Sequence, residues 1–142
     1  MARNHKLELA DELRRQREEQ EIILDTMPAM VWYKDRHNRI LRANRAAAEA
    51  GSRTAAELVG ASTYDLYPDE AEAYHRDDLE VIESGRPKLG IVEQMQTSTG
   101  EKRWVQTDKI PYRDDNGEIV GVIVFAVDLT DQAMAGRLAG AR

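Results

Sequence analysis

The sequence predicts an α+β domain built on one antiparallel sheet of five strands. Two short segments rich in β-branched and aromatic residues come first, several short helical segments with capping residues follow, and three longer strand-like segments come last. Turn signals separate successive strands, among them the strong hairpin sequence Asp115-Asn116-Gly117-Glu118. A chain of 142 residues with 42% hydrophobic and 32% charged residues suits one buried core and is too apolar to remain disordered.

The composition excludes several kinds of function. The absence of cysteine rules out disulfides, thiolate metal sites, a cysteine nucleophile and photochemistry that needs a cysteine adduct. No apolar run reaches the roughly 18 residues of a membrane-spanning helix, and the charged N-terminus lacks the apolar core of a signal peptide. The net charge of −6 argues against a nucleic-acid surface. We therefore expect a cytoplasmic binding or signalling domain, or a small enzyme without cysteine chemistry.

The N-terminal segment, residues 3–24, contains no glycine or proline and consists largely of good helix formers. Apolar and glutamine residues recur in it with the 4-3-4-3-4 spacing of a heptad seam. So narrow a stripe does not stabilise an isolated helix, which should pack on the rest of the domain or on a second copy of itself. We therefore assign residues 1–27 to an amphipathic or coiled-coil helix. Its candidate dimer-interface residues are Leu9, Leu13, Gln16, Gln20, Ile23 and Met27.

Pro28 ends this helix, and strands at residues 30–34 and 40–43 are expected to form the first hairpin. Asn44 is the expected N-cap of a short helix that stops at Gly51, a good residue for a left-handed C-terminal position.

Three further helical segments are expected after this first one. Residues 54–57 have capping-box spacing, and residues 62–65 resemble a second cap. Pro68, followed by two acidic residues, is expected to begin a longer helix that runs to residues 84–85.

The last strands are expected at residues 88–97, 102–112 and 119–128, and residues 131–142 read as the start of a signalling helix or linker. The final strand is apolar at every position from 122 to 127, whereas a strand with one wet face should alternate apolar and polar residues. Its two faces carry Val122, Val124 and Ala126 on one side, and Ile123, Phe125 and Val127 on the other. The body's helices can cover only one face, so we expect the N-terminal helix or a second subunit to cover Ile123 and Phe125.

Several short segments occur in the order and with the gaps of a known family. They are residues 25–29 (DTMPA), 40–44 (ILRAN), 57–60 (ELVG), 79–87 (LEVIESGRP), 100–105 (GEKRWV), 111–121 (PYRDDNGEIVG) and 128–130 (DLT). Together they resemble a PAS domain, the sensor fold of two-component and related signalling proteins. The resemblance implies a sensor core at residues 28–130, with short helices over one sheet face, a cavity beneath them, and a flanking N-terminal helix that packs on the other face and helps to form a dimer. It also implies that Asp128 and Thr130 couple the core to a C-terminal signalling helix.

We therefore expect a sensory and dimerisation module, a homodimer that relays a ligand- or partner-induced change to an effector outside this chain, such as a histidine kinase or a cyclase. The candidate ligand pocket draws on Leu58, Tyr64, Leu79, Ile82, Ile91, Val122 and Val124. One alternative is a ligand-free protein-interaction module, and another is a small α+β enzyme. Since no nucleophile, acid–base pair or metal-ligand spacing stands out, we expect no enzymatic activity and no metal site.

The sequence requires no cofactor. Haem-binding PAS sensors place their iron ligand on the long helix, and His75 lies there, but about one residue out of register, which turns a helical side chain by about 100°. Haem at His75 is therefore a minority interpretation. A non-covalent flavin stacked on Trp32, Trp104 or Tyr64 is a second alternative, and ordinary core filling is the simpler one.

Overall fold

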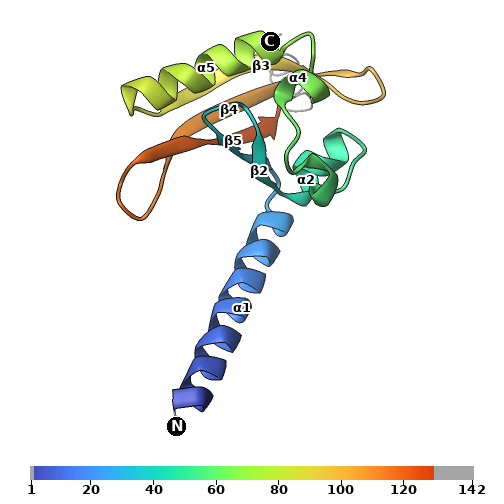
Figure 1. The fold of residues 1–142 in the computed structure, drawn as a ribbon. Helices are drawn as coiled ribbons and strands as arrows, with labels where there is room; N and C mark the ends of the chain where they lie inside the picture. Colours follow the sequence, from blue (N-terminus) through green and yellow to red (C-terminus); the bar gives the residue numbers. More distant parts are fainter. Residues whose placement is uncertain (1, 130–142) are drawn as a thin grey trace, which may run out of the picture.

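The computed structural model describes residues 2–129. A long helix comes first, and the remaining elements form the body (Figure 1). They are α1 (Ala2–Thr26), β1 (Met30–Asp35), β2 (Ile40–Ala43), α2 (Arg45–Ala50), α3 (Ala55–Leu58), α4 (Thr63–Leu66), α5 (Ala71–Ser84), β3 (Lys88–Gln96), β4 (Lys102–Arg113) and β5 (Ile119–Asp128). Thr130 and the expected linker at 131–142 lie outside the described residues.

The sheet has five strands in the order β2-β1-β5-β4-β3, and every neighbouring pair is antiparallel. The first and last strands of the chain therefore lie side by side in the centre, and β1 pairs with β5 along its whole length. This arrangement confirms the predicted α+β class. In Figure 1, α5 runs across the sheet with α4 close to it, and α2 lies beside β2.

Capping residues fix most of the short helices. The Asn44 side chain accepts a hydrogen bond from Ala47 N at the start of α2, and capping boxes begin α3 and α4. Two details differ from expectation. The left-handed position after α2 belongs to Ser52, with φ of 53°, and not to Gly51, with φ of −97°. Helix α5 begins at Ala71 and not at Pro68, because a turn occupies the intervening residues.

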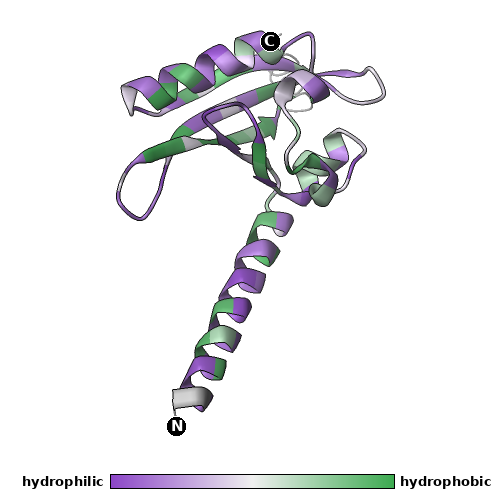
Figure 2. Ribbon diagram, viewed as in Figure 1, coloured by the Kyte–Doolittle hydropathy of each residue, from purple (hydrophilic) through white to green (hydrophobic). Residues whose placement is uncertain are grey.

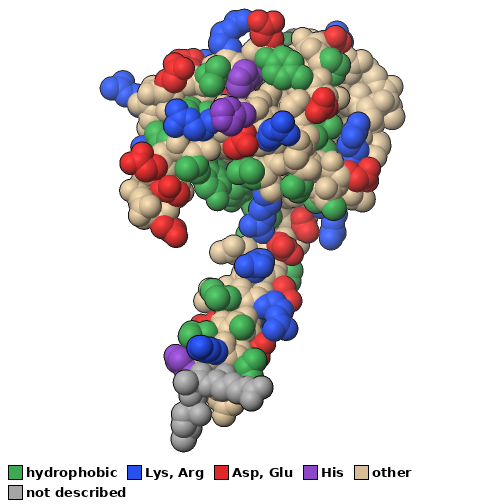
Figure 3. Space-filling model, viewed as in Figure 1, with side chains coloured by type: hydrophobic (Ala, Val, Ile, Leu, Met, Phe, Trp, Pro, Cys, Tyr) green, Lys and Arg blue, Asp and Glu red, His purple; other side chains and the backbone are tan. Residues whose placement is uncertain are grey.

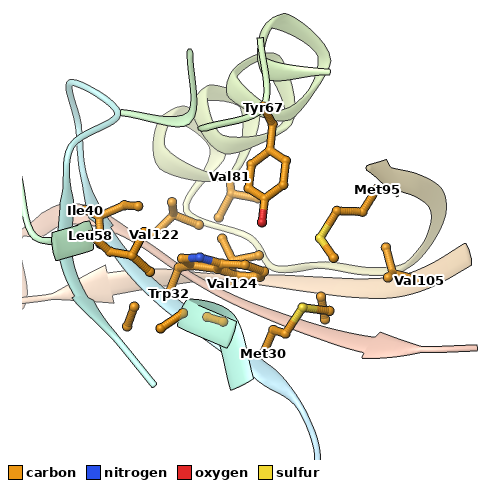
Figure 4. Packing of buried hydrophobic residues seen from close by; sticks show 14 of the residues in the cluster. Met30, Trp32, Ile40, Leu58, Tyr67, Val81, Met95, Val105, Val122 and Val124 are labelled. Carbon is orange, nitrogen blue, oxygen red and sulfur yellow. The ribbon is translucent and has the colours of Figure 1, made fainter. Parts of the chain in front are cut away.

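The hydrophobic core lies between the inner face of the sheet and the helices. Figure 4 shows Trp32, Val122 and Val124 along the sheet, with Tyr67 and Val81 reaching toward them from the helical layer. Burial of these large apolar side chains supplies the main driving force for folding. The buried cluster comprises Met30, Trp32, Ile40, Ala43, Ala47, Ala48, Leu58, Tyr67, Val81, Ile82, Met95, Val105, Val122, Val124 and Ala126.

The outer face of the sheet is only partly covered, contrary to the expectation from β5. Ile123 and Phe125 are half-buried, and Val127 is 39% exposed. Helix α1 does not lie over them: it leaves the body end-on and extends away from the sheet (Figure 1). Figure 2 shows β5 as apolar along its length, and Figure 3 shows hydrophobic side chains gathered beside the junction with α1.

Helix α1 is exposed to solvent along residues 4–23. Its apolar seam residues are correspondingly open, since Leu13 is 61% and Ile23 60% exposed. The C-terminal end is fastened to the body by Asn44, whose Nδ2 donates to Leu24 O at 2.7 Å and to Ala29 O at 2.8 Å. Asp25 Oδ1 also accepts a hydrogen bond from Arg45 N at 2.9 Å. The helix is therefore anchored at one end and free along its seam.

Candidate functional site

A cavity lies between the inner face of the sheet and the layer formed by α4 and α5. It offers about 40 Å³ to the centres of water-sized molecules, which is room for about two or three waters or a small ligand. Most of its wall is apolar or aromatic, and Figure 4 shows Tyr67 reaching into the space above Trp32 and beside Met95. The lining residues are Trp32, Lys34, Ile40, Thr63, Leu66, Tyr67, Tyr74, Glu93, Met95, Val105, Thr107, Lys109, Val124 and Ala126.

Two buried lysines in this wall share one carboxylate. Lys34 Nζ lies 2.5 Å from Asp78 Oδ2, and Lys109 Nζ lies 2.7 Å from Asp78 Oδ1. Their side chains are 7%, 2% and 3% exposed for Lys34, Lys109 and Asp78. Lys109 Nζ also donates to Tyr74 O at 2.9 Å and lies 5.6 Å from the centre of the Tyr74 ring. Charged side chains are seldom this deeply buried, and a buried cluster that is not needed for packing suggests a functional role.

Strand alternation places the lysines on this face. Lys34 follows Trp32 by two residues in β1, and Lys109 follows Thr107 by two in β4, so each lysine points inward with its buried neighbour. Asp78 faces the sheet from α5, whereas the adjacent carboxylate of Asp77 turns outward and pairs with Lys88 at 2.7 Å. Three elements far apart in the sequence thus meet at one charge cluster.

Burial shapes the electrostatics of the cavity wall. Desolvation lowers the pKa of Lys34 below its ordinary value of 10.5, Asp78 raises it, and the positive charge of Lys109 lowers it again. Desolvation raises the pKa of Glu93, and the nearby Lys109 lowers it. Burial raises the pKa of Tyr67 and, more strongly, that of Tyr74, so both phenols stay neutral. The two buried ammonium groups are therefore compensated by one fully buried carboxylate, Asp78, and by the half-buried Glu93.

A polar chain connects the cluster to the turn between β1 and β2. Lys34 Nζ lies 3.5 Å from Thr63 Oγ1, and Thr63 Oγ1 donates to Asn38 Oδ1 at 2.6 Å. Asn38 is buried in the turn with a left-handed φ of 65°. Across the cavity, the buried hydroxyl of Thr107 lies close enough to the Glu93 carboxylate to lower its pKa.

Of the seven residues that the sequence assigns to a pocket, Val124 alone lines this cavity. Leu58, Ile82 and Val122 are buried in the core beside it and have no surface facing the cavity. Leu58 instead lines a neighbouring hollow, together with Trp32 and Tyr67.

The other three assigned residues lie outside the cavity. Tyr64 is 47% exposed, because the one-turn helix α4 buries Thr63 and turns the next residue outward. Leu79 is half-buried and follows the inward Asp78, and one helical step turns a side chain by about 100°. Ile91 is half-buried on the edge strand β3, opposite Thr107. The pocket assignment is therefore revised to the cavity wall described above.

The cofactor alternatives find no support in this geometry. His75 is half-buried on α5, packs edge-on against Tyr64 with ring centres 6.0 Å apart, and does not line the cavity. Of the three aromatic residues considered for flavin stacking, only Trp32 faces the cavity. Among residues 2–129, no group of histidine and carboxylate side chains is arranged to hold a metal ion.

The end of β5 is held by ionic contacts. Arg103 Nε donates to Asp128 Oδ2 at 2.8 Å, and Arg103 Nη1 donates to Glu101 Oε1 at 2.8 Å. Leu129 N donates to Trp104 O at 2.7 Å, which continues the pairing with β4 past the end of the strand. The candidate coupling residue Asp128 is therefore fixed to β4, two residues beyond the cavity-lining Ala126.

The sheet order, the one-sided helical layer and the cavity between them define a small sensory-domain fold. A family model described as the PAS fold matches residues 24–133. The chain therefore belongs to the PAS family. The described residues contain no helix with the length and apolar character needed to cross a membrane.

Similar proteins include two longer curated sequences. An uncharacterized protein, y4lL, of Sinorhizobium fredii is 32% identical over 115 residues, which are 78% of this chain and 14% of the relative. The methanogenesis regulatory histidine kinase FilI of Methanothrix harundinacea is 28% identical over 114 residues, or 80% of this chain and 13% of the relative. The chain thus spans about one seventh of the length of these relatives.

Solved structures of VqmA share the fold. A structure of the Vibrio cholerae VqmA dimer without its target DNA superimposes with a TM-score of 0.74 and 26% identity, covering 83% of this chain and 55% of VqmA. VqmA bound to DPO gives a TM-score of 0.72 with 25% identity, covering 78% of this chain and 57% of VqmA.

Proposed function

We propose that this chain is the ligand-sensing and dimerising part of a larger signalling protein. A small molecule enters the cavity, displaces the lining side chains of β5, and changes how the end of that strand is held. The observation that carries this proposal is the position of Ala126 and Val124, which line the cavity one step and two steps before Asp128 on the same face of one strand. Because packed interiors transmit strain, a change at Ala126 is felt at the clamp between Asp128 and Arg103.

Two copies pair through α1 in this proposal. The seam from Leu9 to Met27 has the spacing of a coiled coil, and its apolar residues between 4 and 23 are open to solvent. A single helix of this kind is marginal in water, so a partner helix stabilises it. The glutamine layers at Gln16 and Gln20 weaken the pairing and leave it adjustable, which suits a relay.

The output lies outside this chain. The histidine kinase FilI is one relative, and the VqmA dimer, which has a target DNA, is another similar protein, so the effector is a kinase-type or a DNA-binding domain. The net charge of −6 leads us to assign any DNA contact to the effector. We propose no catalytic role for the cavity, because its wall presents no activated nucleophile beside a base.

A ligand-free interaction module is the competing function. It is favoured by the small volume of about 40 Å³, which the chain's own side chains could close with little movement. The buried charge cluster speaks against it, since a cavity that serves only for packing is better filled by apolar residues.

A fragment screen by NMR tests the proposal. We expect compounds that shift the backbone amides of Thr107 and Met95 in the cavity wall. The variant Ala126→Val narrows the cavity and should lose these hits, while the control Ala56→Val, at an exposed position of α3, should keep them. A screen in which no compound shifts the cavity amides of the unmodified chain would contradict ligand sensing and favour the interaction module.

Removal of residues 1–24 tests the pairing role of α1. Light scattering should give the mass of a dimer for the full chain and of a monomer for the shortened one. The same mass before and after removal would show that α1 does not hold the subunits together.

A further inference from the structure

We infer that the cavity recognises a small organic anion, a carboxylate on a flat apolar body, through Lys34 and Lys109. The inference rests on the proposed ligand-sensing function and names the class of ligand for that same cavity.

Among the fully buried charges at the cavity the cations outnumber the carboxylates, because the second carboxylate of the wall, that of Glu93, is only half-buried. Asp78 presents one oxygen to each lysine, so the two ammonium groups share a single fully buried carboxylate. Two buried ammonium groups and one carboxylate leave one positive charge without a buried partner. Burying an unpaired charge is expensive, and an anion in the cavity would remove that cost.

The hydrogen-bond donors are unbalanced in the same direction. Each ammonium group has three N–H donors, and the structure assigns two contacts to each: Asp78 and Thr63 to Lys34, and Asp78 and Tyr74 O to Lys109. One donor on each lysine is therefore left over. Unused donors of this kind suit a ligand group with several acceptor lone pairs, and a carboxylate has about four.

The rest of the wall determines the body of the ligand. Trp32, Tyr67, Met95 and Val124 provide flat or apolar surfaces in the wall (Figure 4). Aromatic walls favour a flat ring, which stacks with little loss of conformational freedom. The small volume excludes a long chain, and a single ring with its acid group fits only when the side chains that line the cavity move apart.

One acidic group also faces the cavity. Glu93 of β3 is half-buried near Lys109, and its carboxylate opposes an incoming anion. Burial raises the pKa of Glu93, so this side chain takes up a proton more readily than an exposed glutamate and can lose its opposing charge. The remaining ionisable groups at the cluster are Asp78, Tyr74 and the outward Asp77, which pairs with Lys88. Glu93 is thus the group whose removal should strengthen anion binding.

Calorimetry of the full chain with benzoate and with its neutral isostere benzamide tests the inference. We expect benzoate to bind at least about tenfold more tightly than benzamide, as charge-assisted hydrogen bonds require. Lys109→Met should remove that preference, while Lys88→Met, which makes the same change of charge at the start of β3, where Lys88 pairs with the outward Asp77, should retain it. Benzoate that binds no better than benzamide, or a preference that survives Lys109→Met, would overturn the inference.

A second variant guards against loss of folding. If the circular dichroism of Lys109→Met shows that this variant does not fold, Glu93→Gln supplies the test. This substitution removes the negative charge that opposes an anion, so it should tighten benzoate binding at least about threefold and leave benzamide binding unchanged. Unchanged or weaker benzoate binding to Glu93→Gln would count against the inference. If only neutral fragments bind in the cavity, the anion inference is wrong and the proposed sensing function is retained. If no compound binds in the cavity, both are wrong.

Discussion

Replacing Asp78 by asparagine removes the counter-ion that two buried lysines share and keeps the size of the side chain. The carboxylate oxygens lie 2.5 Å from Lys34 Nζ and 2.7 Å from Lys109 Nζ, and none of the three side chains is more than 7% exposed. Removing one partner of a buried pair costs about 3–5 kcal/mol. Since one carboxylate serves two ammonium groups here, we expect Asp78→Asn to lower the free energy of unfolding by at least about 4 kcal/mol. That is a large part of the about 5–15 kcal/mol by which a domain is stable.

The loss should depend on pH with a definite sign. Desolvation already lowers the pKa of Lys34, and without Asp78 it should fall further below the unfolded value of 10.5. The unfolded state then binds more protons than the folded state, so the stability of the variant rises with pH as the pH approaches 10.5. The slope from one lysine is at most about 1.4 kcal/mol per pH unit.

Urea unfolding at pH 7 and at pH 9.5, followed by Trp32 fluorescence and circular dichroism, measures both effects. The matched control is Asp77→Asn, which removes a neighbouring carboxylate whose partner Lys88 is 37% exposed, and which should cost no more than about 1 kcal/mol. A cost for Asp78→Asn equal to that of the control, or a stability that falls between the two pH values, would refute the reasoning.

Three further changes test other parts of the structure. Gly121→Ala should lower the free energy of unfolding in urea by about 3 kcal/mol or more, because an added Cβ would lie 1.9 Å from Lys34 O on the neighbouring strand β1. A decrease of less than about 1 kcal/mol would show that β1 and β5 separate easily. Asn44→Ala should lower the free energy of unfolding by about 2–4 kcal/mol, because it removes the hydrogen bonds with Leu24 O, Ala29 O, Val31 N and Ala47 N. Hydrogen exchange of the backbone amides should also become faster where α1 joins the body. Unchanged exchange there would argue that Asn44 does not anchor α1. Replacing both Gln16 and Gln20 by leucine should strengthen dimerisation at least about tenfold in sedimentation equilibrium, and weaker association would exclude these positions from the seam.

Local signals in the sequence predict most of the fold. The five strands fall at the expected residues because each is a run of β-branched and aromatic residues between turn signals. The capping side chains of Asn44, Thr54 and Ser62 act as predicted, since an N-cap depends on the few residues that follow it. The start of α5 was missed because Pro68 suits the first turn of a helix and a preceding turn equally well.

The position of α1 could not be derived from the same signals. An apolar seam indicates that a helix packs against another surface, but it does not indicate which surface that is. The six apolar residues of β5 likewise predict that both faces of the strand are buried. Among the described residues, only the face with Val122, Val124 and Ala126 is fully buried. The direction of α1 is set by long-range hydrogen bonds from Asn44 and Asp25, which no local pattern reveals.

The charge cluster was the functional feature that sequence reasoning missed. A lysine in a strand is ordinarily a surface residue, and Asp77 and Asp78 read as a solvated helix segment. A signal was nevertheless present: Lys34 and Lys109 each follow a buried residue at the two-residue spacing of a strand, which places them on the inner face. Their shared partner Asp78 is recognisable only once α5 is packed on the sheet.

The central claim is that the end of β5 responds to what occupies the cavity. The direct measurement is an NMR titration of the full chain with a fragment that binds the cavity, in which the amides of Thr107 and Leu129 are followed together. The account predicts that both amides shift along one saturation curve, and that Ala126→Val abolishes both shifts. If the chemical shift of the Thr107 amide saturates while that of the Leu129 amide does not change, the account is contradicted, because the ligand would then bind in the cavity without affecting the end of β5.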